Sequence, residues 1–129
     1  MAKMIPETEF MRRESPLPRY LPYPVFLLDT DLTMTARVIY ALLLNRVSLS
    51  QMNGWVDEFG RVFVIYTIES LVHDIHKGQT TVKKALAELE DAGLLMRKRK
   101  DFGKPSHLYV KTIPQLDSPC AENQATVKK

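Results

Sequence analysis

The sequence predicts a single domain of the α+β class, in which helices alternate with β-hairpins, and three observations lead to this prediction. The 129 residues are 45% hydrophobic and 26% charged, a balance typical of a globular chain that buries a core. Apolar residues recur at helical spacing in three separate segments. Two further stretches pair short apolar or aromatic runs across turn sequences that contain glycine.

The expected domain spans residues 20–113, with a flexible N-terminal arm at 1–19 and a linker or tail at 114–129. Four of the eight prolines lie between Pro16 and Pro24, where they remove backbone donors and favour an extended, proline-rich segment. This segment leads to an expected short strand at residues 25–28. The last stretch is polar and punctuated by proline, as linkers are.

The first predicted helix covers residues 35–50, with Thr33 or Thr35 as its N-cap. Most of its circumference is apolar. Its narrow polar sector consists of Arg37, Ala41 and Asn45. We therefore expect this helix to be buried on more than one side, either by a partner subunit or by the proline-rich arm.

The remaining elements are expected in the order hairpin, helix, helix, hairpin. The first hairpin lies at residues 55–65, around the turn sequence of residues 57–60. Thr67 caps a short helix that ends at residues 76–78, and a third helix follows from Gln79 to Ala92. A second, basic hairpin covers residues 94–111. Two short helices joined by a glycine-containing turn form a helix-turn-helix, and a basic hairpin after it gives the order of a winged helix-turn-helix.

The distribution of charge along the chain favours a polyanionic partner. The net charge is only +3, but residues 61–113 contain ten basic and six acidic side chains, which accounts for the whole excess. A clustered basic surface attracts nucleic acid phosphates or anionic membranes. Basic runs also occur on ordinary solvated surfaces, so the charge alone does not choose between these interpretations.

The third predicted helix carries the candidate recognition surface on its N-terminal half. If Val82 and Leu89 face the core, the first two turns present an amide, hydroxyls and lysines to solvent. The last two turns are acidic and would repel phosphates, so we expect only the first half to enter a major groove. Glutamine can pair with adenine, lysine with guanine or phosphate, and threonine with phosphate or a thymine methyl group. An ordinary amphipathic surface remains the alternative.

The basic hairpin shifts the balance towards DNA. It contains four consecutive basic residues, which alternate between the two faces of a strand so that one pair meets phosphates or the minor groove. A charged edge that prevents aggregation is the other interpretation of this run. The candidate DNA-binding residues are Lys77, Gln79, Thr80, Thr81, Lys83, Lys84, Arg97, Lys98, Arg99, Lys100 and Lys104.

Other candidate sites are weaker, and we expect no enzyme activity, no cofactor and no bound metal. His73 and His76 lie three residues apart but have no third ligand nearby in sequence. Asp57 and Glu58 sit in a turn, where acidic residues favour local hydrogen bonds. The single cysteine, Cys120, has no catalytic partners in the sequence. No secretory signal and no run of roughly 20 apolar residues is present, so we expect a cytoplasmic protein that does not cross a membrane.

Several motifs resemble the N-terminal domain of plasmid replication initiator proteins of the RepA type. The central one is the run from Asn53 to Ile65, which begins Asn-Gly-Trp-Val-Asp-Glu-Phe-Gly. Further similar motifs occur in the same order at residues 43–50, 88–95 and 103–105. The resemblance extends over residues 20–113, which is nearly the whole expected domain.

This resemblance implies a winged-helix domain that binds repeated origin sequences (iterons) of plasmids as a homodimer and recruits host replication proteins. It maps the family's recognition helix onto residues 79–84 and its wing onto residues 97–104. The turn before that helix, His76 to Gln79, departs from the family's small-polar-basic run, so base specificity does not carry over. The resemblance also implies a further C-terminal domain in such proteins, and we do not expect these 129 residues to include it. A transcription regulator and a protein-interaction adaptor are the alternatives.

Overall fold

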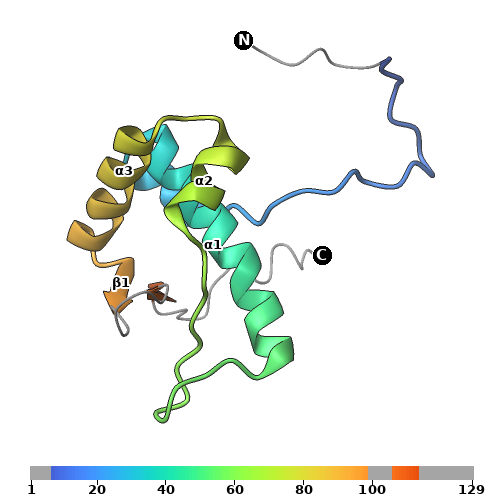
Figure 1. Cartoon of the computed structure of the whole chain (residues 1–129). Helices are drawn as coiled ribbons and strands as arrows, with labels where there is room; N and C mark the ends of the chain where they lie inside the picture. Colours follow the sequence, from blue (N-terminus) through green and yellow to red (C-terminus); the bar gives the residue numbers. More distant parts are fainter. Residues whose placement is uncertain (1–6, 99–105, 114–129) are drawn as a thin grey trace.

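The computed structural model describes residues 7–98 and 106–113. Over these residues the chain forms three α-helices and a two-stranded antiparallel sheet, in the order expected for a winged-helix-like domain (Figure 1). The elements are a short 3-10 helix η1 (Val25–Asp29), α1 (Met34–Asn53), α2 (Ile68–Ile75), α3 (Gln79–Asp91), β1 (Leu95–Lys98) and β2 (His107–Val110). In the described part of the chain, no helix is long and apolar enough to span a bilayer.

Helix α1 is longer than the sequence predicts. Thr33 is its N-cap, and the threonine hydroxyl accepts a hydrogen bond from the backbone N–H of Ala36 at 3.3 Å. The helix continues to Asn53 and ends at Gly54, which has a left-handed backbone with φ of 73°. Ala41, predicted to lie in the polar sector, is instead buried. Its methyl side chain has no polar atom, so nothing opposes that burial.

The helix-turn-helix forms where it is predicted. The Thr67 hydroxyl accepts from the backbone N–H of Ser70 at 3.0 Å and caps α2. His76 ends α2 with a left-handed backbone, φ 58°, and Gly78 is the N-cap of α3. Gly93, with φ of 83°, follows the last turn of α3 and lets the chain reverse into β1. The short turn therefore fixes how α3 is presented.

The core lies between α1, α2, α3 and the sheet. The largest fully buried side chains are Tyr40, Leu27, Ile39, Leu43, Leu71, Leu86, Leu89, Val64 and Val82. Burial of each aliphatic side chain contributes about 1.5–3 kcal/mol. The Tyr40 hydroxyl donates to the backbone carbonyl of Lys111 at 2.7 Å, which ties α1 to the segment after β2. The buried side chains of α3, Val82, Ala85, Leu86 and Leu89, pack into this core and hold the helix in place.

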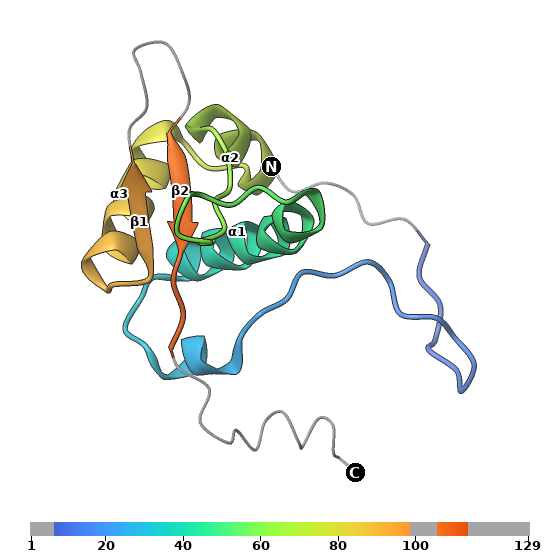
Figure 2. The same ribbon diagram turned by 90° about the horizontal axis from the view of Figure 1, so that it is seen from below.

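The sheet differs from the prediction at its first hairpin. Strands β1 and β2 pair with Leu95 opposite Val110 and Lys98 opposite His107, and they lie side by side next to α3 (Figure 2). The hairpin predicted at residues 55–65 is reduced to one bridge between Val56 and Val62. The hairpin does not extend to Val64, because the backbone of Val64 instead exchanges two hydrogen bonds with Leu108 of β2, at 2.8 and 2.9 Å.

The strand predicted at residues 25–28 is wrong, because this segment forms η1. Pro24 precedes it, and the carbonyls of Pro24 and Leu27 accept backbone bonds from Leu27 and Thr30 at 3.1 and 3.2 Å. These local bonds replace the partner strand that the prediction required. Residues 7–24 contain no helix or strand, and Figure 1 shows them running away from the three helices.

Candidate nucleic-acid interface

The first half of α3 presents the predicted polar residues to solvent. Gln79, Thr80, Thr81, Lys83 and Lys84 are all exposed, while the apolar positions of the same helix are buried. In the described part of the chain, no hydrogen bond or ion pair involves the side chain of Lys83 or Lys84. Both ammonium groups are therefore available to an external anion.

The second half of α3 has a different role from the one predicted. The Glu88 carboxylate accepts from the backbone N–H and the hydroxyl of Thr33, at 2.7 and 2.9 Å, and joins α3 to the start of α1. Glu90 accepts from Nη2 of Arg97 at 2.8 Å and joins α3 to β1. Sequence reasoning treated these carboxylates only as groups that repel phosphates. Their partners lie 55 and 7 residues away, so no spacing within the helix reveals them.

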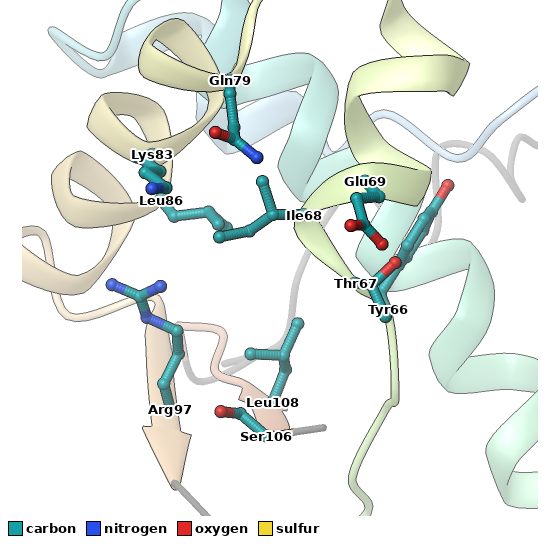
Figure 3. A pocket seen from close by; sticks show the side chains of 10 residues that line it. All are labelled: Tyr66, Thr67, Ile68, Glu69, Gln79, Lys83, Leu86, Arg97, Ser106 and Leu108. Carbon is teal, nitrogen blue, oxygen red and sulfur yellow. The ribbon is translucent and has the colours of Figure 1, made fainter. Parts of the chain in front are cut away.

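One flank of α3 faces a cavity of about 390 Å³ (Figure 3). Its walls are α3, the start of α2, and the two strands. Figure 3 shows the side chains of Gln79 and Arg97 directed towards the space between these elements. The lining residues are Tyr66, Thr67, Ile68, Glu69, Gln79, Lys83, Leu86, Arg97, Ser106 and Leu108. Two of the predicted cations, Lys83 and Arg97, are thus brought to one cavity.

Lys77 does not join this group. It lines a separate cavity of about 160 Å³ with Met34, Thr35, Val38 and Ile75, beside the first turn of α1. Thr80 and Lys84 line neither cavity and project from the outer face of α3. The predicted residues around the turn and on α3 therefore form three separate sets: a flank towards the hairpin, an outer face, and a lysine next to α1.

The predicted wing is only partly within the described residues. Arg97 and Lys98 lie on β1, where Arg97 is paired with Glu90 and Lys98 is exposed. Arg99, Lys100 and Lys104 lie outside the described residues. Alternation along β1 separates Arg97 from Lys98, as the sequence predicts, and it is Arg97 that lines the cavity next to α3.

The acidic turn at residues 57–61 serves local structure. Asp57 accepts from the backbone N–H groups of Phe59 and Arg61 at 2.8 and 2.9 Å, and from Nε of Arg61 at 2.9 Å. Desolvation acts to raise the pKa of Asp57, but these hydrogen bonds and the guanidinium outweigh it and lower the pKa to about 2. The carboxylate thus stabilises the turn, as the sequence interpretation expects.

The two histidines considered as metal ligands have other contacts or roles. His73 Nδ1 lies 3.3 Å from a carboxylate oxygen of Asp74. His76 ends α2 in a left-handed conformation. Asp74 also accepts from the Tyr66 hydroxyl; burial, followed by this bond, raises the pKa of Tyr66 to about 12. Cys120 lies outside the described residues.

The family model for the N-terminus of replication initiator protein A (RepA) matches residues 20–123. The chain belongs to this family. Its RepA N-terminal match covers every helix and strand described above, including the cavity between α3 and the sheet.

Solved structures and a curated relative resemble the chain. One structure, titled "N-Terminal domain of DNA binding protein", is 28% identical, with a TM-score of 0.64 over 86% of this chain and 89% of that one. A second, "Structure of Rep-DNA complex", is 28% identical, with a TM-score of 0.63 over 86% and 90%. A third, "Structure of MDR initiator", is 27% identical, with a TM-score of 0.63 over 86% and 91%.

The curated relative is a "41 kDa protein" from Lactobacillus helveticus, which is 34% identical over 71 residues. The match covers 55% of this chain but only 20% of the relative's length. The RepA N-terminal domain described here therefore corresponds to a small part of that longer protein.

Proposed function

We propose that the chain is the sequence-specific double-stranded DNA-binding domain of a plasmid replication initiator. In this proposal the first half of α3 enters the major groove, and the β1–β2 hairpin acts as a wing against the neighbouring backbone and minor groove. The observation that carries it is the exposed, unpaired Lys83 and Lys84 on a helix presented by a helix-turn-helix. Membership of the RepA N-terminal family and likeness to a structure titled as a Rep–DNA complex support it.

The faces of α3 suggest how the contacts are divided. Thr80 and Lys84 project away from the core, so in a major groove they would lie nearest the base edges. Gln79 and Lys83 face the wing and would lie nearest the backbone. We therefore assign base recognition to the outer face and phosphate binding to the flank. Lys98 adds an exposed cation on β1.

We further propose that the domain acts as a homodimer on repeated origin sequences (iterons), in the cytoplasm and together with host replication proteins. Support for a dimer comes from the segment before α1, where Phe10, Leu17 and Tyr20 are 83%, 69% and 74% exposed. A second copy that covers these apolar side chains would remove them from water. The proposed role is binding and assembly on DNA, with no reaction catalysed by this domain.

The test is selection of bound duplexes from a random pool, followed by titration of the recovered duplex against salt. A Lys83→Ala/Lys84→Ala variant is measured in parallel. If roughly five phosphates are contacted, a fourfold rise in salt lowers the affinity on the order of several-hundred-fold, and the variant has a shallower salt dependence. Absence of an enriched sequence, together with binding that the variant leaves unchanged, would reject DNA binding in favour of an adaptor.

A further inference from the structure

The cavity next to α3 lies between α3 and the β1–β2 wing. The proposed function places α3 in the major groove and the wing against the neighbouring minor groove. Gln79, Lys83 and Leu86 line the cavity from α3, while Arg97 of β1, Leu108 of β2 and Ser106, just before β2, line it from the wing (Figure 3). Its volume is about 390 Å³, and it is open to solvent. The following inference rests on the proposed DNA binding and concerns what occupies this space.

The geometry of duplex DNA says what must cross there. A major groove and the minor groove beside it are separated by one sugar–phosphate strand. A domain with α3 in the first groove and the wing in the second therefore has that strand running between them. The strand carries a negative charge at every phosphate, so its seat needs cations and hydrogen-bond donors. The cavity is lined by residues of both α3 and the wing, so it is the candidate space for this strand.

The donors at the cavity come from two sides. Lys83 is exposed and unpaired within the described residues. Arg97 is paired with Glu90 through one nitrogen, Nη2, and its side chain is 34% exposed. A guanidinium carries five N–H donors, so an arginine held on one side by a carboxylate still has donors for a phosphate on the other.

If the only purpose of this surface were to attract phosphates, a carboxylate such as Glu90 would not be expected beside it. Glu90 lies on the same flank of α3 as the cavity-lining residues and places a negative charge near a proposed polyanion. Its bond of 2.8 Å to Arg97 joins the recognition helix to the wing, and the other two ion pairs in the described part of the chain are local. A carboxylate in this position fixes both the direction of the guanidinium and the spacing between α3 and β1.

We propose that this cavity seats the backbone strand between the two grooves, and that Arg97 bridges Glu90 and a phosphate of that strand. Lys83 is the second phosphate contact. Glu90 touches no DNA; it is a positioning residue that acts through Arg97. Glu69, on the opposite wall at the start of α2, is the carboxylate that limits how far the strand enters.

The test compares four chains: wild type, Glu90→Gln, Arg97→Ala and the double variant. Each is titrated with the selected duplex at several salt concentrations. Arg97→Ala lowers the affinity, and the slope of log affinity against log salt becomes shallower by about 0.9, the value for one phosphate. Glu90→Gln lowers the affinity roughly three- to tenfold, and the double variant binds like Arg97→Ala alone.

The matched control for Glu90 is Asp91→Asn. Asp91 is the neighbouring residue on α3, is exposed, and its side chain makes no hydrogen bond or ion pair within the described residues. Loss of this charge near DNA raises the affinity or leaves it unchanged, because repulsion falls. Opposite signs for the two neutralised carboxylates are thus expected. Binding by Glu90→Gln that is as tight as by Asp91→Asn would overturn the positioning role.

The matched control for Lys83→Ala is Lys111→Ala. Lys111 lies after β2 and lines a different groove with Val47, Gln51 and Met96. Lys83→Ala makes the salt slope shallower by about 0.9, and Lys111→Ala does not change it. A normal slope for both Lys83→Ala and Arg97→Ala would reject the backbone seat while leaving DNA binding itself intact. A wild-type chain that binds no duplex would reject the proposed function as well. Thermal melting of every variant separates loss of fold from loss of contact.

Discussion

The two halves of α3 use their polar side chains in opposite ways. In the first half, Lys83 and Lys84 are exposed and make no ion pair within the described residues. In the second half, Glu88 binds Thr33 and Glu90 binds Arg97, so both carboxylates are committed to neighbouring elements. One short helix thus combines a surface for an external anion with anchors that hold that surface in place.

This difference explains why Glu88 and Glu90 are compatible with the proposed DNA-binding surface nearby. Free carboxylates there would repel phosphates, whereas carboxylates that accept two bonds or pair with a guanidinium contribute to the fold. The comparison therefore predicts that changes at Glu88 or Glu90 affect stability or geometry. Changes in the exposed first half affect binding alone.

The largest expected effect comes from a substitution on the buried face of α3, to which both halves of the helix contribute. Leu86 is 2% exposed and lies in the core between α3 and the sheet. Leu86→Ala leaves a cavity and lowers the free energy of unfolding by about 2–5 kcal/mol. Urea denaturation followed by circular dichroism measures this loss, with Ala87→Ser on the exposed face as the control. An unchanged midpoint for Leu86→Ala would mean that α3 is rotated differently.

A smaller loss of stability is expected at the anchor of the second half. Thr33→Ala removes both the N-cap of α1 and the hydroxyl bond to Glu88. The free energy of unfolding falls by about 0.5–2 kcal/mol, the usual cost of a lost cap. Thr35→Ala, two residues further along the chain, is the control, because the side chain of Thr35 makes no hydrogen bond within the described residues. Equal melting temperatures for the two variants would mean that the Thr33 cap and its bond to Glu88 do not stabilise the fold.

The outer face of the first half is tested by binding specificity. Lys84→Ala relaxes the preference at one base pair of the selected duplex, at a cost of about 1–3 kcal/mol there, and leaves the melting temperature unchanged. Lys83→Ala, by contrast, weakens binding to all duplexes alike. Repeated selection from the random pool with each variant measures both effects. If Lys84→Ala weakened every duplex equally, the lysine would be a backbone contact.

How far the sequence predicts this arrangement depends on how many residues separate the two groups that interact. The period of apolar residues in α3 correctly predicts which face is buried, and local cap chemistry predicts Thr67 and the break at residues 76–78. The bond between Thr33 and Glu88 spans 55 residues and leaves no mark in local spacing. The hairpin at residues 55–65 is shorter than predicted, because Val64 pairs with Leu108 of β2, a partner that the local sequence does not reveal. The predicted strand at residues 25–28 is replaced by η1, whose hydrogen bonds are local.

The smallest expected effect concerns Asp57, a structural carboxylate that lies outside α3. The pKa of Asp57 is lowered to about 2 in the folded chain, below its ordinary value of 3.8. A group with a lowered folded pKa stabilises the fold above its unfolded pKa, and that contribution is lost as the pH falls from about 4 towards about 2. Asp57→Asn keeps the side-chain oxygen that the turn uses but removes the charge.

We therefore expect Asp57→Asn to lower the melting temperature slightly at neutral pH and to reduce the difference from wild type as the pH falls towards about 2. Glu58→Gln, the neighbouring exposed carboxylate, serves as the control. DNA affinity should not change, because Asp57 holds the turn that precedes Val62 and lies on neither half of α3. A gap between Asp57→Asn and wild type that stayed constant from neutral to acidic pH would mean that the charge does not stabilise the turn. The turn would then depend on the hydrogen bonds of Asp57 and not on its charge.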